Sequence, residues 1–353
     1  NNVNSFVLKT IKEIPLKIQR IRKPNKAISW MLLDEQFKPV EPVVRYIGFL
    51  ESLNRSPHTI RSYICRLRLY WEFLRETHRD WKSITFADLS QFIVWLRSPG
   101  SERESQTAVR SESTVNHALS VIYNFYSYHS RCGISTNIHA SFQPIFLRGS
   151  YKSFLHGIVK QQPKQVKLLK LKEPKFFPGN LSAQEVQTVL NACRHLRDRF
   201  LIYLLYETGL RIGEALGLRH EDIVSEGINE IRVVPREDNI NGARVKSNRE
   251  RTVHVSSTFM SLYSRYLIEE YPPVDSDYVF VNIWQGKIGH PMTYSCVKSL
   301  FWSLSKKTGI RIYPHLLRHT HATELIRSGW DMALVQKRLG HSSVQTTIDT
   351  YVH

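Results

Sequence analysis

The chain has 353 residues, of which 42% are hydrophobic and 11% aromatic, with 49 basic against 31 acidic side chains. This length and apolar content exclude a wholly disordered chain and predict two domains, each with its own core. The net charge of +18 favours a polyanionic partner, and no apolar run reaches the roughly 20 residues that span a bilayer. The single cysteines Cys65, Cys132, Cys193 and Cys296 form no CxxC pair, and no signal peptide is visible, which indicates a cytoplasmic protein with reduced thiols.

The first domain is predicted to be helical and to follow a basic segment. Residues 1–37 are rich in lysine and arginine and are interpreted as an N-terminal arm outside any core, either contacting DNA or solvated. Residues 38–146 show helical periodicity in FKPVEPVVRYIGFLESL, RSPHTIRSYICRLRLYWEFLRETH, FADLSQFIVWLRS and STVNHALSVIYNFYSYH. Ser56 is the expected N-cap of the second helix, with Pro57 at its first position.

The next segment, residues 147–175, loses this periodicity. It holds eight basic residues and one acidic residue, Glu173, which predicts an extended basic linker suited to following a phosphate backbone.

The second domain is predicted over residues 176–353. It should begin with a helix capped by Ser182 and Glu185, followed by a nearly apolar, central helix that ends at Gly209. INEIRVVP and RERTVHV alternate like strands, and helical patterns dominate afterwards. The predicted fold is therefore mainly α with a small antiparallel β-sheet.

Several residues of this domain are suited to phosphate chemistry. Arg211, in TGLRIGEAL, should start a helix beside the central one, where a rigid guanidinium either grips two phosphate oxygens or pairs with Glu214. Arg318 follows His315 by three residues, on one face of a helix. Tyr351 can act as a nucleophile only beside a base and an anion-neutralising site, because the pKa of a tyrosine is near 10.

The histidines also raise the question of a zinc site. His315 and His319 have the spacing of a helical zinc motif, but Leu316 stands where a metalloprotease needs glutamate, and Arg318 would repel the metal. A zinc hydrolase is therefore the less favoured alternative.

Taken in order, these residues resemble the active site of tyrosine recombinases of the phage integrase family. The family order is Arg, Lys, His-x-x-Arg, His or Trp, and Tyr. SPHTIRSYICRLRLYWEFL also resembles the start of the helical core-binding domain of that family, so the resemblance covers both domains, with residues 176–353 as a mixed α/β catalytic domain. The order is met by Arg211, Lys246 in VKSNRERTVHV, His315, Arg318, His341 in LGHSSVQTT, and Tyr351 in DTYVH, although Arg244, Arg249 and Arg251 crowd the turn of Lys246.

The resemblance implies a role for each residue. Tyr351 attacks the scissile phosphate and forms a 3′-phosphotyrosyl link, while Arg211 and Arg318 clamp the non-bridging oxygens. Lys246 protonates the departing 5′-oxygen, and His315 exchanges the proton of the tyrosine. His341 supports the phosphate. The covalent link keeps the bond energy, so no cofactor is implied: neither ATP nor a divalent metal is required.

The same resemblance implies duplex DNA as partner, a tetramer on two duplexes, and possible accessory recombination proteins. The basic N-terminus with RIRKPNKAISWMLLDE resembles transposon-encoded recombinases, which favours a transposase of a prokaryotic mobile element, acting at the nucleoid. The alternatives are a phage or conjugative-element integrase, a type IB topoisomerase, and a non-catalytic DNA-binding relative. Family members usually continue into a C-terminal helix that docks on a neighbouring subunit. Because the sequence ends at His353, we expect either a further segment or a different assembly.

Overall fold

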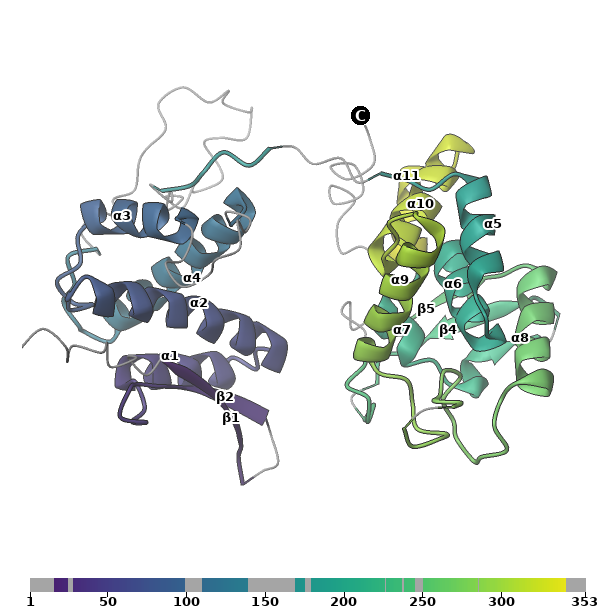
Figure 1. Ribbon diagram of the computed structural model, residues 1–353, viewed down its shortest axis with the longest axis horizontal. Coiled ribbons are helices and arrows are strands. Elements are labelled where there is room, and N and C mark those ends of the chain that lie inside the picture. Colours follow the sequence, from purple (N-terminus) through teal and green to yellow (C-terminus); the bar gives the residue numbers. More distant parts are fainter. Residues whose placement is uncertain are drawn as a thin grey trace, which may run out of the picture. The chain divides into compact units, whose positions relative to one another are not determined.

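The structure is a computed structural model that describes residues 16–24, 28–98, 110–138, 169–174, 179–225, 227–236, 238–244, 250–284 and 286–340. The chain divides into two compact units, residues 1–175 and 176–353 (Figure 1). Each unit contains a hydrophobic core of its own. The fold is mainly helical with small antiparallel sheets, which confirms the predicted fold class. In the described ranges, no helix has the length and apolar character needed to cross a membrane.

The first unit packs a β-hairpin against a group of helices (Figure 1). Ser56 caps the second helix as predicted, because its hydroxyl accepts a hydrogen bond from the amide of Thr59 at 3.2 Å. Thr85 and Asp88 form a reciprocal capping box at the third helix. The elements are β1 (Lys17–Arg22), β2 (Ile28–Leu33), α1 (Glu41–Ser52), α2 (Pro57–Glu76), α3 (Phe86–Arg97) and α4 (Glu112–Arg131).

The hairpin corrects the interpretation of residues 1–37 as an arm outside any core. Strands β1 and β2 pair in antiparallel register from Lys17 opposite Leu33 to Arg22 opposite Ile28. Leu32 is fully buried in the core that α1, α2 and α4 form, and the guanidinium of Arg61 lies 5.2 Å from the ring centre of Trp30. Lys17, Arg20 and Arg22 therefore belong to strand β1 of a folded hairpin. Residues 1–15 lie outside the described part.

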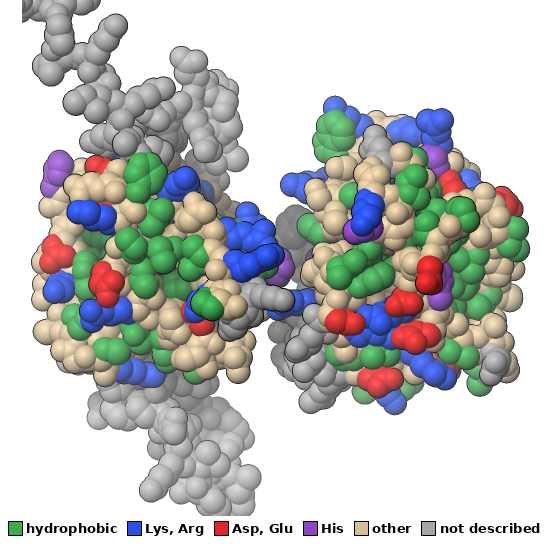
Figure 2. Space-filling view, turned by 90° about the horizontal axis from the view of Figure 1, so that it is seen from below, with side chains coloured by type: hydrophobic (Ala, Val, Ile, Leu, Met, Phe, Trp, Pro, Cys, Tyr) green, Lys and Arg blue, Asp and Glu red, His purple; other side chains and the backbone are tan. Residues whose placement is uncertain are grey.

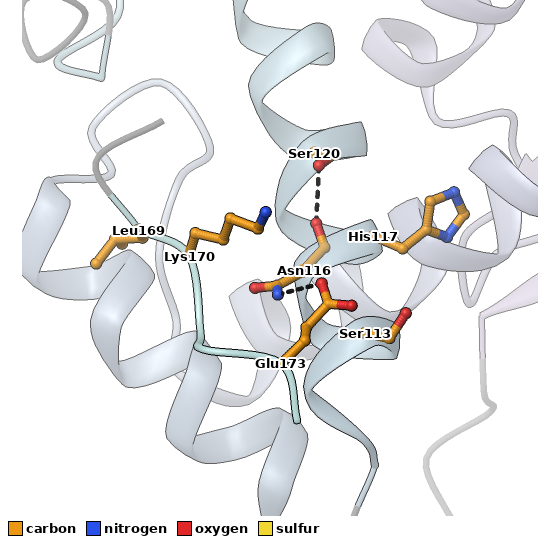
Figure 3. A pocket seen from close by; sticks show the side chains of 7 residues that line it. All are labelled: Ser113, Asn116, His117, Ser120, Leu169, Lys170 and Glu173. Atoms are coloured by element: carbon orange, nitrogen blue, oxygen red, sulfur yellow. Dashed lines mark hydrogen bonds between the residues drawn. The ribbon is translucent and has the colours of Figure 1, made fainter. Parts of the chain in front are cut away.

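The end of the predicted linker also belongs to the first unit. Residues 169–174 run along α4, where the side-chain amide of Asn116 bonds to the backbone of Leu171 in both directions, at 2.9 and 2.8 Å. The same amide donates to Glu173 at 2.7 Å, beside a cavity of about 300 Å³ that Lys170 and His117 also line (Figure 3). Residues 139–168 and 175–178 lie outside the described residues, so the exact linker bounds stay a prediction.

The second unit is built around α6, whose Phe200, Leu201 and Leu205 are fully buried. It contacts α10, α8, α5 and α7. The antiparallel order β3-β4-β5 confirms the strands predicted on both sides of Lys246. The elements are α5 (Ala183–Ala192), α6 (Leu196–Thr208), α7 (Ile212–Leu216), a 3-10 turn (His220–Asp222), β3 (Ile223–Val224), β4 (Glu230–Val233), β5 (Arg251–His254), α8 (Ser257–Glu269), α9 (Tyr294–Thr308), α10 (Pro314–Arg327) and α11 (Met332–Leu339).

Candidate active site

The candidate site is organised around the C-terminus of α11. This helix ends at Gly340, which has a left-handed backbone with φ of 65°. The last carbonyls of a helix lack partners within the helix and carry partial negative charge. Here three successive carbonyls accept hydrogen bonds from arginines of three other elements: Arg251 Nε to Arg338 O (3.0 Å), Arg318 Nη2 to Leu339 O (2.7 Å), and Arg211 Nη2 to Gly340 O (3.1 Å).

Arg211 is placed by the turn that follows α6. Gly209 ends α6 in a left-handed conformation, as predicted, and Arg211 then caps the short helix α7. Its Nη1 donates to Glu214 Oε1 at 3.0 Å, and its backbone amide donates to Glu214 Oε2 at 2.9 Å. The pairing with Glu214 is therefore present. The side chain of Arg211 is 20% exposed, so part of it still reaches solvent.

Arg318 lies deeper, on the face of α10 that packs against α6. The residue is 3% exposed, and its Nη1 donates to the carbonyl of Gly209 at 2.6 Å. With its bond to Leu339, this guanidinium joins the ends of α6 and α11. Because Arg211 also bonds to the end of α11, the two predicted arginine clamps converge on one place.

Glu214 links Arg211 to the sheet. Its side chain is fully buried and also receives two hydrogen bonds from Arg251 of β5, Nη1 to Oε1 at 3.1 Å and Nη2 to Oε2 at 2.7 Å. Burial would raise the pKa of this carboxyl, but the hydrogen bonds and charges of Arg251 and Arg211 outweigh it and hold the pKa below its ordinary value. Glu214 is therefore ionised at neutral pH, between two guanidinium groups.

The histidines of α10 differ in their surroundings. His315, in the first turn, is exposed, and its ring centre lies 6.1 Å from that of His319. Burial, helped by the charges of His315 and Arg318, lowers the pKa of His319 to about 4. Burial, with the charges of Arg338 and Arg318, lowers the pKa of His321 to about 3, and its Nε2 accepts from Arg338 Nε at 3.0 Å. His321 is therefore a neutral packing residue, whereas His315 faces solvent.

The structure describes half of the predicted catalytic set. Arg211 and Arg318 meet at the end of α11, and His315 lies three residues before Arg318 on the same helix. Lys246, His341 and Tyr351 fall outside the described residues. Their assignments stay predictions. In the sequence, His341 directly follows Gly340, whose carbonyl Arg211 binds.

From the sequence, no role in the site is assigned to two residues that the structure places there, Glu214 and Arg251. Glu214 was considered only as a partner that might neutralise Arg211, and Arg251 only as a neighbour crowding the turn of Lys246. The alternation of strand β5 could have identified Arg251, because it stands two residues before the buried Val253 and so faces the core. An arginine on the core side of a strand needs a partner, and Glu214 is that partner.

Comparison with known proteins places this geometry in a family. Residues 179–353 match the model described as the phage integrase family, and residues 43–133 match that of the phage integrase N-terminal SAM-like domain. Transposase A from transposon Tn554 of Staphylococcus aureus is 43% identical over 345 residues, which cover 96% of this chain and 94% of that protein. The chain belongs to the phage integrase family. The resemblance inferred from the order of the site residues is thus confirmed.

Other members of the phage integrase family are more distant. Tyrosine recombinase XerC of Staphylococcus carnosus is 29% identical over 306 residues, covering 84% of this chain and 87% of that protein. The Tn1549 transposon integrase in complex with a circular intermediate DNA has a TM-score of 0.63 at 18% identity, covering 88% of this chain and 95% of that chain. The XerH recombinase bound to its palindromic difH substrate has a TM-score of 0.59 at 22% identity, covering 84% and 77%. These structures share the fold of this family member.

Proposed function

We propose that this protein is a site-specific DNA recombinase that serves a mobile element as its transposase. It cuts and rejoins DNA strands through a 3′-phosphotyrosyl intermediate. The observation that carries the proposal is the convergence of Arg211 and Arg318 at the end of α11, just before the segment that holds His341 and Tyr351 in the sequence. The identity of 43% to a transposase, over nearly the whole of both chains, favours a transposon over a phage or conjugative element.

The proposed chemistry distributes charge and protons over six residues. Arg211 and Arg318 bind the non-bridging oxygens and stabilise the extra negative charge of the pentacoordinate phosphorus, which is the largest single contribution expected in such a site. Tyr351 attacks the phosphorus, and Lys246 protonates the departing 5′-oxygen. His315 takes the phenolic proton, and His341 donates a hydrogen bond to the phosphate. The reverse attack by a 5′-hydroxyl restores the phosphodiester, so no energy source is consumed.

The proposed partner is duplex DNA at the ends of the element and at its target. Exchange between two sites requires four protomers on two duplexes, with accessory recombination proteins as further candidates. Among the relatives, the Tn1549 integrase is described with a circular intermediate DNA and XerH with its difH site, which supports a DNA partner here. Such a substrate would place the protein at the bacterial nucleoid.

The test uses a nicked duplex that carries one element end, incubated with the full chain in EDTA and separated on a denaturing gel. Cleavage beside the nick releases a short strand, so the covalent adduct accumulates. The wild type should give a slowly migrating protein–DNA adduct, and Tyr351→Phe should give none. Tyr294→Phe is the matched control, because Tyr294 is an exposed tyrosine of the same unit, and it should keep the adduct.

The remaining outcomes contradict parts of the proposal. An adduct that persists in Tyr351→Phe means that another residue is the nucleophile. Binding without any adduct means a non-catalytic DNA-binding protein. Relaxation of a supercoiled plasmid that lacks element ends favours the topoisomerase alternative.

A further inference from the structure

Arg251 is the one member of the arginine cluster at the end of α11 to which the proposed mechanism gives no role. Its side chain is 8% exposed. The guanidinium bonds to two different groups: Nη1 and Nη2 hold both oxygens of Glu214, and Nε donates to the carbonyl of Arg338. A planar guanidinium with donors on two edges is suited to such a bridge, and a lysine ammonium is not.

The partners of Arg251 connect it to the proposed phosphate clamp. Glu214 is fully buried and is shared between Arg251 and Arg211. If Arg251 were removed, the buried carboxylate of Glu214 would lose one of its two cationic partners. It would then attract more of the N–H donors of Arg211, or it would take up a proton. Either change moves the guanidinium of Arg211 relative to the carbonyl of Gly340, to which its Nη2 is bonded.

The fit at Gly340 shows how closely Arg251 approaches the end of α11. A Cβ atom at Gly340 would lie 2.9 Å from Nη1 and 3.0 Å from Cζ of Arg251. The guanidinium therefore fills the space beside the residue that directly precedes His341.

We propose that Arg251 is a positioning residue for strand cleavage: by holding Glu214 and the end of α11, it fixes Arg211 where the scissile phosphate must bind. This inference rests on the proposed function. It assigns to Arg251 no contact with DNA and no proton transfer. Its effect passes through Glu214 and through the carbonyl of Arg338.

The experiment measures single-turnover cleavage of the nicked duplex at saturating protein, and separately the affinity for an intact duplex. Arg251→Gln should cleave about 100-fold more slowly, the loss expected when a transition-state group is misplaced by about 1 Å. Arg251→Lys keeps the charge but not the bridge, and should lose roughly tenfold. The affinity for DNA should stay within about threefold of the wild type, because phosphates distributed along the duplex dominate binding.

Arg265→Gln is the matched control. Arg265 is an exposed arginine of the same unit, and it bonds to Glu269 one helical turn away on α8. The substitution removes the same charge and also an arginine–carboxylate pair, but this pair belongs to α8, which is far from α11 in the sequence. Its cleavage rate should equal that of the wild type.

A pH profile separates positioning from a merely structural role. Within the described part of the chain, the charged groups that face Glu214 are Arg211 of its own element and Arg251 of β5. Without Arg251, burial should raise the pKa of Glu214, so cleavage by Arg251→Gln should fall more steeply than that of the wild type as the pH decreases. Adding Glu214→Gln should abolish this extra pH dependence, and the double variant should lose much less activity than the product of the two single losses.

The outcomes separate this inference from the proposed function. If the wild type forms no adduct, the proposed function itself fails. If the wild type forms one and Arg251→Gln cleaves as fast as Arg265→Gln, the role of Arg251 is refuted. It is also refuted if Arg251→Gln and Arg251→Lys lose DNA affinity and thermal stability in parallel with cleavage, because Arg251 would then support only the fold.

Discussion

At the scale of single residues, Gly209 shows how closely the helices of the site approach one another. It ends α6 with φ of 63°, and its carbonyl accepts from Arg318. A Cβ atom there would lie 2.6 Å from Cδ2 of His321 and 2.8 Å from Cδ2 of Leu339. The residue therefore needs both the left-handed backbone and the absence of a side chain, since α10 and α11 meet against it.

Gly209→Ala should be much more damaging than Gly309→Ala. Both glycines end helices of the second unit in a left-handed conformation, but nothing lies within 4 Å of a Cβ atom at Gly309. Gly309→Ala should lower the free energy of unfolding by about 1–2 kcal/mol, the cost of the backbone conformation. Overpacking adds about 1–3 kcal/mol more at Gly209. Urea unfolding of the two variants measures the difference, and equal losses would mean that the contact with His321 and Leu339 relaxes without cost.

At the scale of elements, the sequence predicts helix ends well, because a few adjacent residues determine them. Ser56, Ser182 and Gly209 end or begin helices where expected, because caps and left-handed turns depend on a few adjacent residues. The hairpin of β1 and β2 was missed, since its lysines and arginines suggested a solvated arm. Its stability depends on the burial of Leu32 against helices that come later in the chain. Tertiary packing of this kind has no local signal.

The return of residues 169–174 to α4 is a second element that composition alone did not predict. The amide of Asn116 holds the backbone of Leu171 as a strand partner would, accepting from its N–H and donating to its carbonyl. Asn116 is 8% exposed, so these bonds are shielded from water. A basic composition predicted an extended linker, but the buried amide of Asn116 and the apolar contacts of Leu169 and Leu171 attach its end to the first unit.

Asn116→Ala should detach this segment. The amide of Leu171 would lose its acceptor, and its hydrogen exchange should speed up roughly 30-fold, as expected from the loss of the two bonds to Leu171 at about 1 kcal/mol each. Asn124→Ala is the control, because Asn124 lies on the same helix with its side chain exposed. Unchanged protection of Leu171 in Asn116→Ala would show that the apolar contacts of Leu169 and Leu171 hold the segment without the amide.

At the scale of the whole molecule, the order of residues predicted the family and the meeting of Arg211 with Arg318, but not how they are held. Motif order follows from chemistry that a family shares. The way they are held depends on Arg251 of β5, which binds Glu214 and also the carbonyl of Arg338 at the end of α11, 87 residues further along the chain. The charge of +18 is likewise a property of the chain that no single site explains. Figure 2 shows lysine and arginine side chains on the visible face of both units, with acidic side chains interspersed among them.

This charge leads to a last prediction, on the salt dependence of DNA binding. If the protein binds duplex DNA through phosphates, counterions are released, and the logarithm of the association constant should fall linearly with the logarithm of the salt concentration. With six to ten phosphates contacted, affinity should fall by about 10³–10⁵-fold between 50 and 200 mM salt. Fluorescence anisotropy of the full chain on a labelled duplex measures this slope.

Single variants then identify which charges contribute to that slope. Arg211→Gln should reduce the slope by about one, because the proposed contact of Arg211 is to a phosphate. Arg265→Gln should leave the slope unchanged, because no phosphate contact is proposed for Arg265, an exposed residue of α8 that is paired with Glu269. A slope near zero for the wild type would mean that contacts other than phosphates dominate binding. An unchanged slope in Arg211→Gln would mean that Arg211 engages the phosphate only as the strand is cut, which would assign its whole contribution to the transition state.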